Sequence, residues 1–356
     1  MTKYNIFIIG TRAQLIKVAP TLRVFEEQGL PSKFILTGQH NDTMGDIIEE
    51  FGIKTPPIPL IKNKEHSSIL ALLSWLPRIF FLIILTLKQY KKSNIFVHGD
   101  TLTTLMSTLA AKFTGHFVIH LESGLTSKTL FNPFPEEIIR RIVFQCTDVA
   151  CCPSEKDAQH MKIYPKAKIL YTNGNTILDS IIYLKIGENI KKEPNTILVS
   201  LHRFHNIYNK ERLQSIVEML VTLSEQYTIN FVLHPATQKK LSQYGFLEII
   251  KNNRINLLPR MLYQKFLNLA LSNEIVITDG GSNQEELAYF GHPTIILRKT
   301  TERQDGLGRN AILINEPQDI IKFIISKEYT ILEKEKLNLT SSPSGVIANY
   351  FKSQDI

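Results

Sequence analysis

The sequence predicts an α/β protein with two parallel-sheet domains that face each other across a cleft. Short apolar runs alternate with helical stretches, which is typical of βαβ units. The alternation restarts after a break near Gly174. The 356 residues, 43% of them hydrophobic, are enough for two cores of ordinary size. No repeat or low-complexity linker interrupts the pattern.

Four buried strands are expected in each half. In the first half they are YNIFIIG, KFILTG, NIFVHGD and HFVIHLE, with helices from about Leu15 to Gln28 and from about Leu102 to Phe113. In the second half they are TILVSLH, INFVLHP, EIVITDG and PTIILR, with a helix from Gln284 to Phe290. In such sheets ligands bind beyond the carboxyl ends of the strands.

Nearly every expected strand ends in polar or charged residues. These ends are Gly10-Thr11-Arg12, Thr37-Gly38-Gln39-His40, His98-Gly99-Asp100-Thr101, His120-Leu121-Glu122, His202-Arg203, His234-Pro235 and Asp279-Gly280-Gly281-Ser282. Polar turns alone would not require this accumulation of charge. The pattern therefore predicts an active site along the strand ends.

Composition narrows the class of ligand. The net charge of +8 favours acidic ligands such as phosphates, but the 41 basic residues are spread along the chain, which argues against a nucleic-acid arm. Cys146, Cys151 and Cys152 form no CxxC pair and no zinc spacing, so they are expected to be reduced core thiols of a cytoplasmic protein without a metal. The N-terminus enters an apolar strand and lacks the features of a signal peptide.

The segment from Ser67 to Leu87 carries about twenty mostly apolar residues, near the length of a membrane span. Pro77-Arg78 interrupts it, and a central arginine costs roughly 2.5–3.5 kcal/mol on insertion scales. A buried helix pair or a helix in a subunit interface is therefore favoured. Peripheral membrane contact through this face and the lysines that follow it remains an alternative.

Two carboxylates are expected at neighbouring strand ends in the first half. His120 and Glu122 alternate on one face of a strand, and Asp100 ends another. Such a pair can serve as general acid and base if the site perturbs its pKa values. The alternative is that Asp100 caps a helix and Glu122 forms a structural ion pair.

Cations accompany these acids. Gly10-Thr11-Arg12 opens a helix that carries Lys17, an arrangement that suits anion binding, although a surface lysine is more often solvated. After Pro135, the pairs Glu136/Arg140 and Glu137/Arg141 are each spaced i,i+4. At least one of these two pairs is expected to be structural.

The stretch TDGGSNQEE places a strand, a glycine turn and a helix start in succession. The amides of Gly280, Gly281 and Ser282, with the positive end of the helix dipole, can hold a diphosphate. Glu286, one turn into the helix, can accept hydrogen bonds from ribose hydroxyls, and Arg303 supplies a further cation. The alternatives are a plain strand-to-helix turn and a solvated surface arginine.

These residues resemble a family. GTRAQLIKVAP, TGQHND, HGDTLTT, HLESGL, FPEE with Arg140, GNTILD, LHR with Asn206, TDGGSNQEE and TER occur in the order found in the non-hydrolysing UDP-N-acetylglucosamine 2-epimerases. The resemblance implies two Rossmann-like domains in the GT-B arrangement. These are residues 1–172, completed by a C-terminal helix within 343–356, and the nucleotide-binding residues 173–342. It also implies a homodimer, a UDP-sugar substrate, and no metal or cofactor.

The resemblance also implies a mechanism and a set of roles. The family eliminates UDP to give an enzyme-bound glycal and adds UDP back with the C2 proton on the other face. Asp100, Glu122 and Glu136 would transfer protons, with His202 nearby. The substrate and its phosphates would meet Arg12, Lys17, Arg140 and Arg303, while Gly280, Gly281, Ser282, Glu286 and His234 would hold or border the nucleotide. The implied setting is bacterial surface-polysaccharide precursor synthesis.

Several motifs differ from the family pattern. GTRPE becomes Gly10-Thr11-Arg12-Ala13-Gln14, AGLR becomes Ser123-Gly124-Leu125-Thr126, HRREN becomes His202-Arg203-Phe204-His205-Asn206, and TERPE becomes Thr301-Glu302-Arg303-Gln304-Asp305. These differences bear on the sugar substituents and on a second, allosteric UDP-sugar site. The alternatives are a hydrolysing relative that releases UDP, a GT-B glycosyltransferase acting on a membrane-linked acceptor, and a non-catalytic UDP-sugar binder.

Overall fold

The computed structural model describes residues 3–39, 44–61, 69–127, 129, 134–251, 253–301, 303–338 and 341–353, with only the backbone for 69–74. The chain forms two compact units, Met1–Leu184 together with Leu339–Ile356, and Lys185–Asn338. The sequence places the boundary at residue 172. The units divide at Leu184 because helix α7 (Ile177–Tyr183) packs against α1 (Arg12–Glu27) in the first unit.

The first unit contains a seven-stranded sheet in the order β3-β2-β1-β4-β5-β6-β7, in which every neighbouring pair is parallel. The strands are β1 (Asn5–Ile9), β2 (Ser32–Leu36), β3 (Pro57–Pro59), β4 (Asn94–His98), β5 (Phe117–Leu121), β6 (Val149–Cys152) and β7 (Lys168–Tyr171). The strand order reverses between β1 and β4, so this pair is the topological switch point at which such sheets bind ligands.

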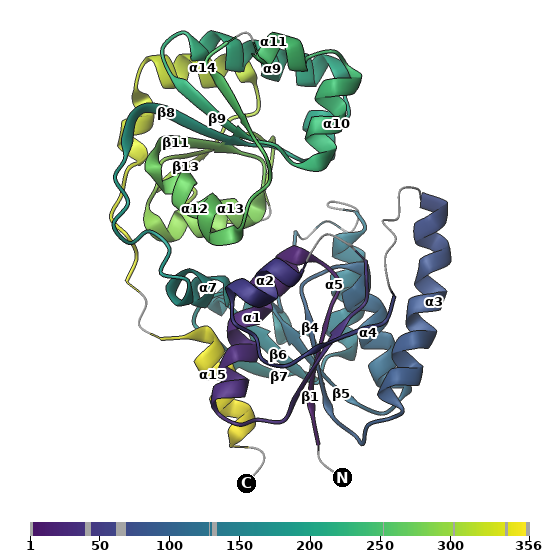
Figure 1. Cartoon of the computed structure of the whole chain (residues 1–356). Helices are drawn as coiled ribbons and strands as arrows, with labels where there is room; N and C mark the ends of the chain where they lie inside the picture. Colours follow the sequence, from purple (N-terminus) through teal and green to yellow (C-terminus); the bar gives the residue numbers. More distant parts are fainter. Residues whose placement is uncertain are drawn as a thin grey trace. The chain divides into compact units, whose positions relative to one another are not determined.

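Helices cover both faces of this sheet (Figure 1). Besides α1 and α7 they are α2 (Gly45–Glu50), α3 (Ile69–Leu87), α4 (Leu102–Phe113), α5 (Glu136–Cys146), α6 (Glu155–Met161) and α15 (Pro343–Lys352). Alternate residues of β1 face opposite layers, as the strand period requires. Ile6 and Ile8 belong to the core shared with α3 and α4, whereas Phe7 packs on Phe25 of α1.

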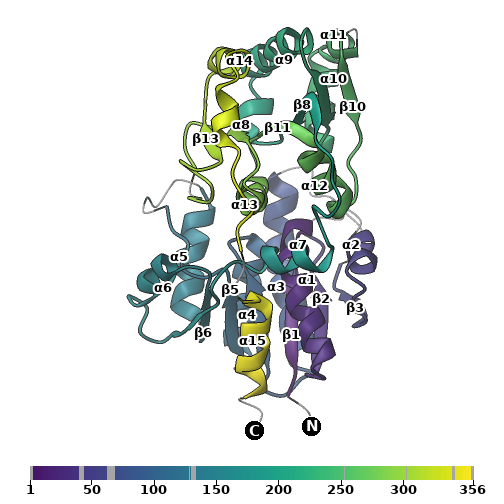
Figure 2. The ribbon, with the colours of Figure 1, turned by 90° about the vertical axis from the view of Figure 1, so that its left-hand side faces the viewer.

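The last helix belongs to the first unit. Figure 2 shows α15 beside α1, with α7 close to both. The Phe351 ring lies 5.0 Å from Phe96 and 6.2 Å from Phe25 between centroids. Asp179 of α7 accepts the Ser344 N–H at 2.7 Å. The chain thus returns to its N-terminal half and completes that core.

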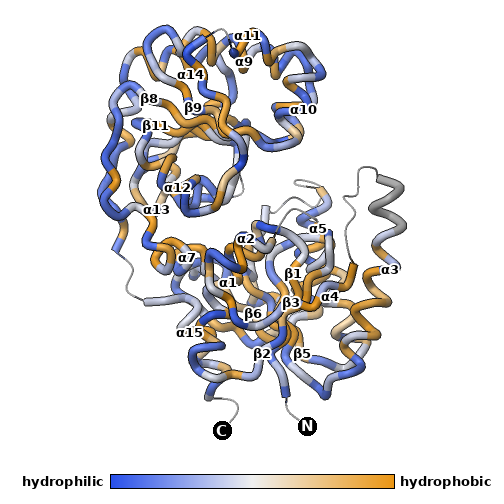
Figure 3. The backbone as a smooth tube through the Cα atoms, in the orientation of Figure 1, coloured by the Kyte–Doolittle hydropathy of each residue, from blue (hydrophilic) through white to orange (hydrophobic). Residues whose placement is uncertain are grey.

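Helix α3 lies in the apolar segment for which peripheral membrane contact was the alternative prediction. Trp75, Ile79 and Ile83 are buried against the sheet, whereas Phe81 and Leu85 are 62% and 60% exposed. Figure 3 shows apolar residues along the described part of this helix. None of the helices in the described residues has the length and hydropathy that a membrane crossing requires, and residues 62–68 lie outside that range.

The second unit contains a six-stranded parallel sheet in the order β10-β9-β8-β11-β12-β13. Its strands are β8 (Glu193–Ser200), β9 (Thr228–Val232), β10 (Ile255–Leu258), β11 (Asn273–Thr278), β12 (Thr294–Ile296) and β13 (Ala311–Leu313). Its helices are α8 (Phe204–Ile207), α9 (Lys210–Ser224), α10 (Pro235–Gln243), α11 (Leu247–Lys251), α12 (Tyr263–Ser272), α13 (Gly281–Phe290), α14 (Pro317–Ile325) and the 3₁₀ helix η1 (Glu328–Leu332).

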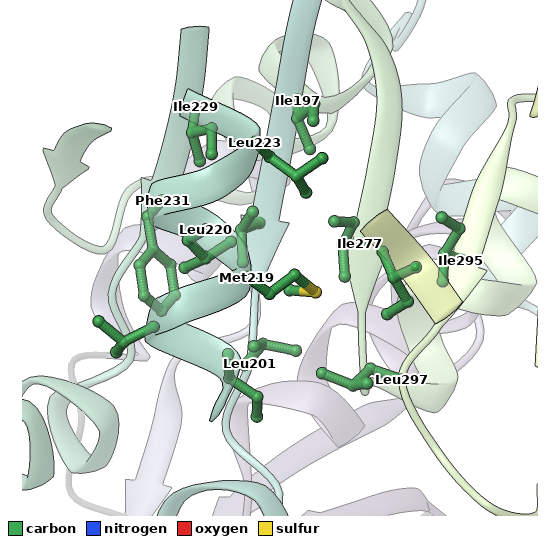
Figure 4. Packing of buried hydrophobic residues seen from close by; sticks show 14 of the residues in the cluster. Ile197, Leu201, Met219, Leu220, Leu223, Ile229, Phe231, Ile277, Ile295 and Leu297 are labelled. Atoms are coloured by element: carbon green, nitrogen blue, oxygen red, sulfur yellow. The ribbon is translucent and has the colours of Figure 1, made fainter. Parts of the chain in front are cut away.

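The second core forms where α9 packs against the sheet. Met219, Leu220 and Leu223 meet Phe231 and Ile277 from the strands (Figure 4). Here the order reverses between β8 and β11, so the ends of those two strands form the second switch point. The prediction of two parallel-sheet α/β domains is confirmed.

Candidate active site

A buried glutamine ties together the two strand ends at the first switch point. The Gln14 carbonyl oxygen accepts the N–H groups of Gly10 at 2.9 Å and Thr11 at 3.1 Å. Its amide donates to the His98 carbonyl at 2.7 Å and to Thr101 Oγ1 at 3.0 Å. Gln14 therefore fixes the turn that carries Arg12 against the loop that carries Asp100.

Arg12 starts α1 and is held by an acid that sequence reasoning missed. Its Nη1 lies 2.5 and 2.6 Å from the two carboxylate oxygens of Asp46 in the first turn of α2. The Arg12 side chain is 10% exposed and that of Asp46 is 29% exposed. Helix α2 also carries Glu49 and Glu50, so the sequence does not show which of its acids meets Arg12, and only the fold does.

Glu122 lies in a small polar cluster just past the end of β5. Lys17 Nζ and Asn175 Nδ2 both contact its Oε1, at 2.7 and 2.8 Å. His98 Nε2 lies 3.5 Å from its Oε2. The backbone of Glu122 has φ of 57°, in the left-handed region that non-glycine residues rarely adopt. The predicted cation Lys17 and the predicted acid Glu122 are thus brought together, and the side chains of both are under 10% exposed.

His120 is a buried neutral support for this loop. Its Nε2–H donates to the Gly99 carbonyl at 2.8 Å, and Ser123 Oγ donates to its Nδ1 at 2.9 Å. Burial lowers the pKa of His120 to about 4, although the Gly99 carbonyl and the charges of Asp100 and Glu122 oppose that change. The ring consequently holds the backbone beside Asp100 without adding charge.

Asp100 and Arg140 form the second acid and cation pair. Asp100 Oδ2 lies 2.5 Å from Arg140 Nη2, where the Arg140 side chain is 5% exposed and that of Asp100 is 27% exposed. Arg140 Nη1 also contacts Glu137 at 3.3 Å. The exposed fraction of Asp100 leaves part of its carboxylate accessible.

Glu137 is the structural member of the two acids that begin α5. It is fully buried and accepts Thr126 Oγ1–H at 2.6 Å, Ser127 N–H at 3.0 Å and Arg141 Nε–H at 3.3 Å. Burial raises its pKa, but these hydrogen bonds and the nearby charge of Arg140 outweigh that effect and lower it. Glu137 binds the loop after Glu122 to α5.

Glu136 has a different environment. Its Oε2 is buried, and it makes no hydrogen bond to any described residue. An unsatisfied buried carboxylate oxygen is costly unless a ligand or water meets it. Of the two predicted i,i+4 pairs on α5, the described residues therefore contain Glu137 with Arg141. The Glu136 Oε2 atom remains available to a ligand or a water molecule.

In the second unit, Asp279 organises the switch point. It is fully buried at the end of β11 and accepts the N–H groups of His202 at 3.0 Å and Arg203 at 2.9 Å. It also accepts Asn206 Nδ2–H at 3.0 Å. Sequence reasoning placed Asp279 in a motif but gave it no role; it anchors the loop that carries His202.

The His202 side chain is 41% exposed, and its Nδ1 lies 3.4 Å from Asp279 Oδ1. Its ring centroid is 5.4 Å from that of His234, which caps the N-terminus of α10. Loss of hydration lowers the pKa of His202, and the charges of Arg203, Arg260 and Arg298 add to this, whereas Asp279 opposes it. The two histidines thus lie together near a group of cations.

The glycine turn leads into α13 as the sequence predicts. Gly280 is the N-cap of α13, and no side chain of the described residues caps that terminus. The first amides of a helix, with its dipole, favour an anion. Glu286 is 2% exposed, so its carboxylate lies within the unit rather than on its surface.

Arg303 is fixed on its loop by partners from α13. Its Nη1 lies 2.8 Å from Glu285 Oε2, an acid that the sequence analysis did not single out. Gln284 Nε2 donates to the carbonyls of Arg303 at 3.2 Å and Asp305 at 2.8 Å. The loop cation and the helix N-terminus therefore form one assembly.

Comparison with known proteins shows to which family the chain belongs. The family model described as UDP-N-acetylglucosamine 2-epimerase matches residues 23–344. The chain belongs to this family. Within the described residues, no group of three or more histidine, cysteine, aspartate or glutamate side chains is arranged to hold a metal ion.

Individual family members are similar over almost the whole chain. The UDP-N-acetylglucosamine 2-epimerase of Methanococcus maripaludis is 31% identical and aligns over 89% of each chain. A Methanocaldococcus jannaschii UDP-GlcNAc 2-epimerase solved with UDP-GlcNAc and UDP has a TM-score of 0.82 at 27% identity, covering 99% of this chain and 100% of that one. The UDP-GlcNAc-bound Neisseria meningitidis enzyme has a TM-score of 0.80 at 25% identity, covering 98% and 100%. The family resemblance predicted from the motifs is confirmed.

Proposed function

We propose that this member of the UDP-N-acetylglucosamine 2-epimerase family inverts C2 of the sugar in UDP-N-acetylglucosamine and keeps UDP on its product. The family assignment supports the substrate class. The observation that carries the proposal is the pair of acids at adjacent strand ends, each held by a cation: Asp100 by Arg140 at 2.5 Å and Glu122 by Lys17 at 2.7 Å. Two acids beside a switch point fit proton transfer on both faces of a ring.

The reaction needs both acids and cations because the C2 proton is not acidic. No carbonyl neighbours C2, so departure of the diphosphate must lead. The C1–O bond breaks with its electrons on UDP, a carboxylate takes the C2 proton, and a glycal forms. In the return step UDP adds to C1 while C2 receives a proton on the opposite face.

We assign proton transfer to Asp100, Glu122 and Glu136, and an assisting role to His202. Asp100 is partly exposed, and Glu136 presents a buried oxygen that no described residue satisfies. Glu122 carries backbone strain of the kind that accumulates at active sites. Asp100→Asn or Glu122→Gln should abolish turnover with little loss of UDP affinity.

Four cations are assigned to the substrate and its phosphates, and each contacts a carboxylate. The pairs are Arg12 with Asp46, Lys17 with Glu122, Arg140 with Asp100, and Arg303 with Glu285. Such pairing orients the cations before the substrate arrives, which lowers the entropy lost on binding. Arg303→Ala should weaken UDP binding.

The nucleotide is assigned to the second unit. The diphosphate would meet the amides of Gly281 and Ser282, with Glu286 at the ribose and His234 beside the nucleotide. The Gly280 N–H, which the sequence also assigned to the diphosphate, donates to Thr278 Oγ1 at 3.1 Å. The N-terminus of α13, without a side-chain cap among the described residues, supports this role. Neither hydrolysis to free sugar nor glycosyl transfer is favoured by the family assignment.

We further propose a cytoplasmic homodimer in which the exposed face of α3 joins two copies. Phe81 and Leu85 on α3 and Phe113 at the end of α4 are each at least 60% exposed, and three free cysteines suit a reducing compartment. Phe81→Ser combined with Leu85→Ser should convert the dimer to a monomer in light scattering. Wild-type protein that is monomeric and co-sediments with anionic liposomes would instead assign this face to peripheral membrane contact.

Proton and phosphorus NMR of the protein with UDP-N-acetylglucosamine in heavy water tests the function. Deuterium at C2 of recovered UDP-sugar together with a new manno isomer is expected. Free UDP with free sugar would identify hydrolysis instead. An unchanged spectrum would overturn the proposal for this substrate.

A further inference from the structure

The fold gathers lysines that are far apart in the sequence at the amino-terminal edge of the first sheet. Lys3 precedes β1, Lys33 lies in β2, and the turn from Lys88 to Lys92 leads into β4. Because β2, β1 and β4 are parallel neighbours, the three strand starts span two strand spacings, about 10 Å. In Figure 1 this edge lies near the N label, where β1 begins. We call Lys3, Lys33, Lys88, Lys91 and Lys92 the amino-edge lysines.

The turn that carries three of these lysines is fixed at both ends. The Ser93 N–H donates to the Nδ1 atom of His116 at 3.0 Å, and the Nε2 atom of that ring lies 3.2 Å from the Leu87 carbonyl oxygen. The Tyr4 N–H donates to Ser93 Oγ at 3.2 Å. Loss of hydration lowers the pKa of His116, although its backbone hydrogen bonds oppose this change, so the ring is neutral and keeps both contacts. The turn is thus held against the starts of β1 and β5.

Aromatic rings hold the amino-edge lysines beside one another. Lys3 Nζ lies 5.9 Å from the centroid of the Phe117 ring, and Lys92 Nζ lies 4.3 Å from the same centroid. Lys33 Nζ lies 5.1 Å from the centroid of the Tyr4 ring. Such cation–π contacts orient the ammonium groups but leave their charge in place. Because the Phe117 side chain is 38% exposed, an apolar surface accompanies the charges.

The positive charge at this edge is not balanced by carboxylates. Among the described residues, none of the amino-edge lysines forms an ion pair. Two acids near the same edge have other partners: Asp148, before β6, contacts Lys112 at 2.6 Å, and Glu27, at the end of α1, contacts Arg23 at 2.9 Å. Ammonium groups of like charge repel one another, so a negatively charged partner would relieve this repulsion.

We propose that the amino-edge lysines and Phe117 dock the protein on a membrane surface that carries anionic phospholipids. Lysine ammonium groups act as point charges and lack the planar fork with which arginine binds a single phosphate, so they suit a surface of many phosphates. A partly exposed aromatic ring among cations fits the boundary between headgroups and acyl chains. Asp100 and Glu122 follow the carboxyl ends of β4 and β5, so the docking surface and the two acids lie at opposite edges of one sheet.

Co-sedimentation with vesicles made of equal parts of phosphatidylglycerol and phosphatidylcholine tests this proposal. Each lysine near an anionic surface strengthens binding about fivefold, so Lys91→Ala combined with Lys92→Ala should weaken binding about 25-fold. Wild-type protein should bind at an ionic strength of about 10 mM and be released at about 1 M, because the Debye length falls from about 30 Å to about 3 Å. Vesicles of phosphatidylcholine alone should bind neither protein.

Lys239→Ala combined with Lys240→Ala is the matched control. It removes two adjacent lysines from α10 of the second unit and lowers the net charge equally, so its vesicle binding should follow wild type. Wild-type protein that stays in the supernatant at low ionic strength, or an equal loss of binding in both double variants, would overturn the proposal. Binding that survives in the first double variant but is lost in Phe81→Ser with Leu85→Ser would also overturn it and assign the contact to α3. Vesicle binding is measured without turnover, so these outcomes are independent of the proposed epimerase function.

Discussion

The adjacent acids Glu136 and Glu137 should respond in opposite ways to the same substitution. Glu137 is fully buried and bound to Thr126, Ser127, Arg140 and Arg141, whereas Glu136 has a buried oxygen without a partner among the described residues. Glu137→Gln should therefore destabilise the first unit. Glu136→Gln should leave its stability nearly unchanged and remove activity.

The magnitude follows from the contacts. Hydrogen bonds to a charged group contribute about 1.5–3 kcal/mol each, and removing one partner of a buried ion pair costs about 3–5 kcal/mol. Glutamine keeps one acceptor oxygen, so we expect a loss of about 2–4 kcal/mol for Glu137→Gln. Glu136→Gln should change stability by less than about 0.5 kcal/mol and lower kcat at least about 100-fold.

Urea unfolding followed by tryptophan fluorescence measures this difference. Trp75 is the only tryptophan of the chain, and it lies buried in the first unit, so its signal reports that unit alone. Equal midpoints for wild type and Glu137→Gln, or near-wild-type kcat for Glu136→Gln, would refute the reasoning.

The effect of pH gives a second check on Glu137. Its pKa is lowered in the folded state, so its ionised form contributes stability above the usual value of 4.5. That contribution is lost as pH falls below 4.5 and through the lowered folded pKa. The midpoints of wild type and Glu137→Gln should therefore converge in acid, and a gap that widens there would contradict the assignment.

Three further substitutions test the packing of the first unit and the anchoring role of Asp279. Gly10→Ala would place a Cβ 2.0 Å from the Thr103 hydroxyl, and overpacking of this kind costs about 1–3 kcal/mol in the same fluorescence assay. Asp279→Ala leaves buried N–H donors without their acceptor and should weaken UDP binding at least about tenfold by calorimetry, with an unchanged affinity counting against its anchoring role. Phe351→Ala should destabilise the first unit by about 3–5 kcal/mol, whereas Tyr350→Ala, on a half-buried neighbour, should cost much less.

Several short or edge strands were not predicted from the sequence. Strands β1, β2, β4 and β5 follow from long apolar runs, and the three-residue β12 lies within the predicted run PTIILR. Strands β3 and β13, also of three residues, were not predicted. Strand β7 has no buried residue in its pattern, because it lies at the edge of the sheet. Such strands are specified by the neighbour that pairs with them rather than by their own residues.

Site residues were predictable where they directly follow a predicted strand. Asp100, Glu122 and Asp279 each follow an apolar run, so their position at the carboxyl end of a strand can be predicted from the sequence. Their partners were not predictable. Asn175 and Glu285 lie within the motifs GNTILD and TDGGSNQEE, and Asp46 lies in no quoted motif. Only the fold shows that their partners are Glu122, Arg303 and Arg12.

The sequence by itself determined the class of fold, the family and the strand ends at which chemistry is expected, because hydrophobic periodicity and turn residues are local properties of the chain. Only the tertiary structure decided which of two adjacent glutamates is bound by its neighbours and which donors contact Glu122. Those outcomes depend on donors that lie up to 105 residues away in the chain, and no local pattern records the distance between two side chains in space.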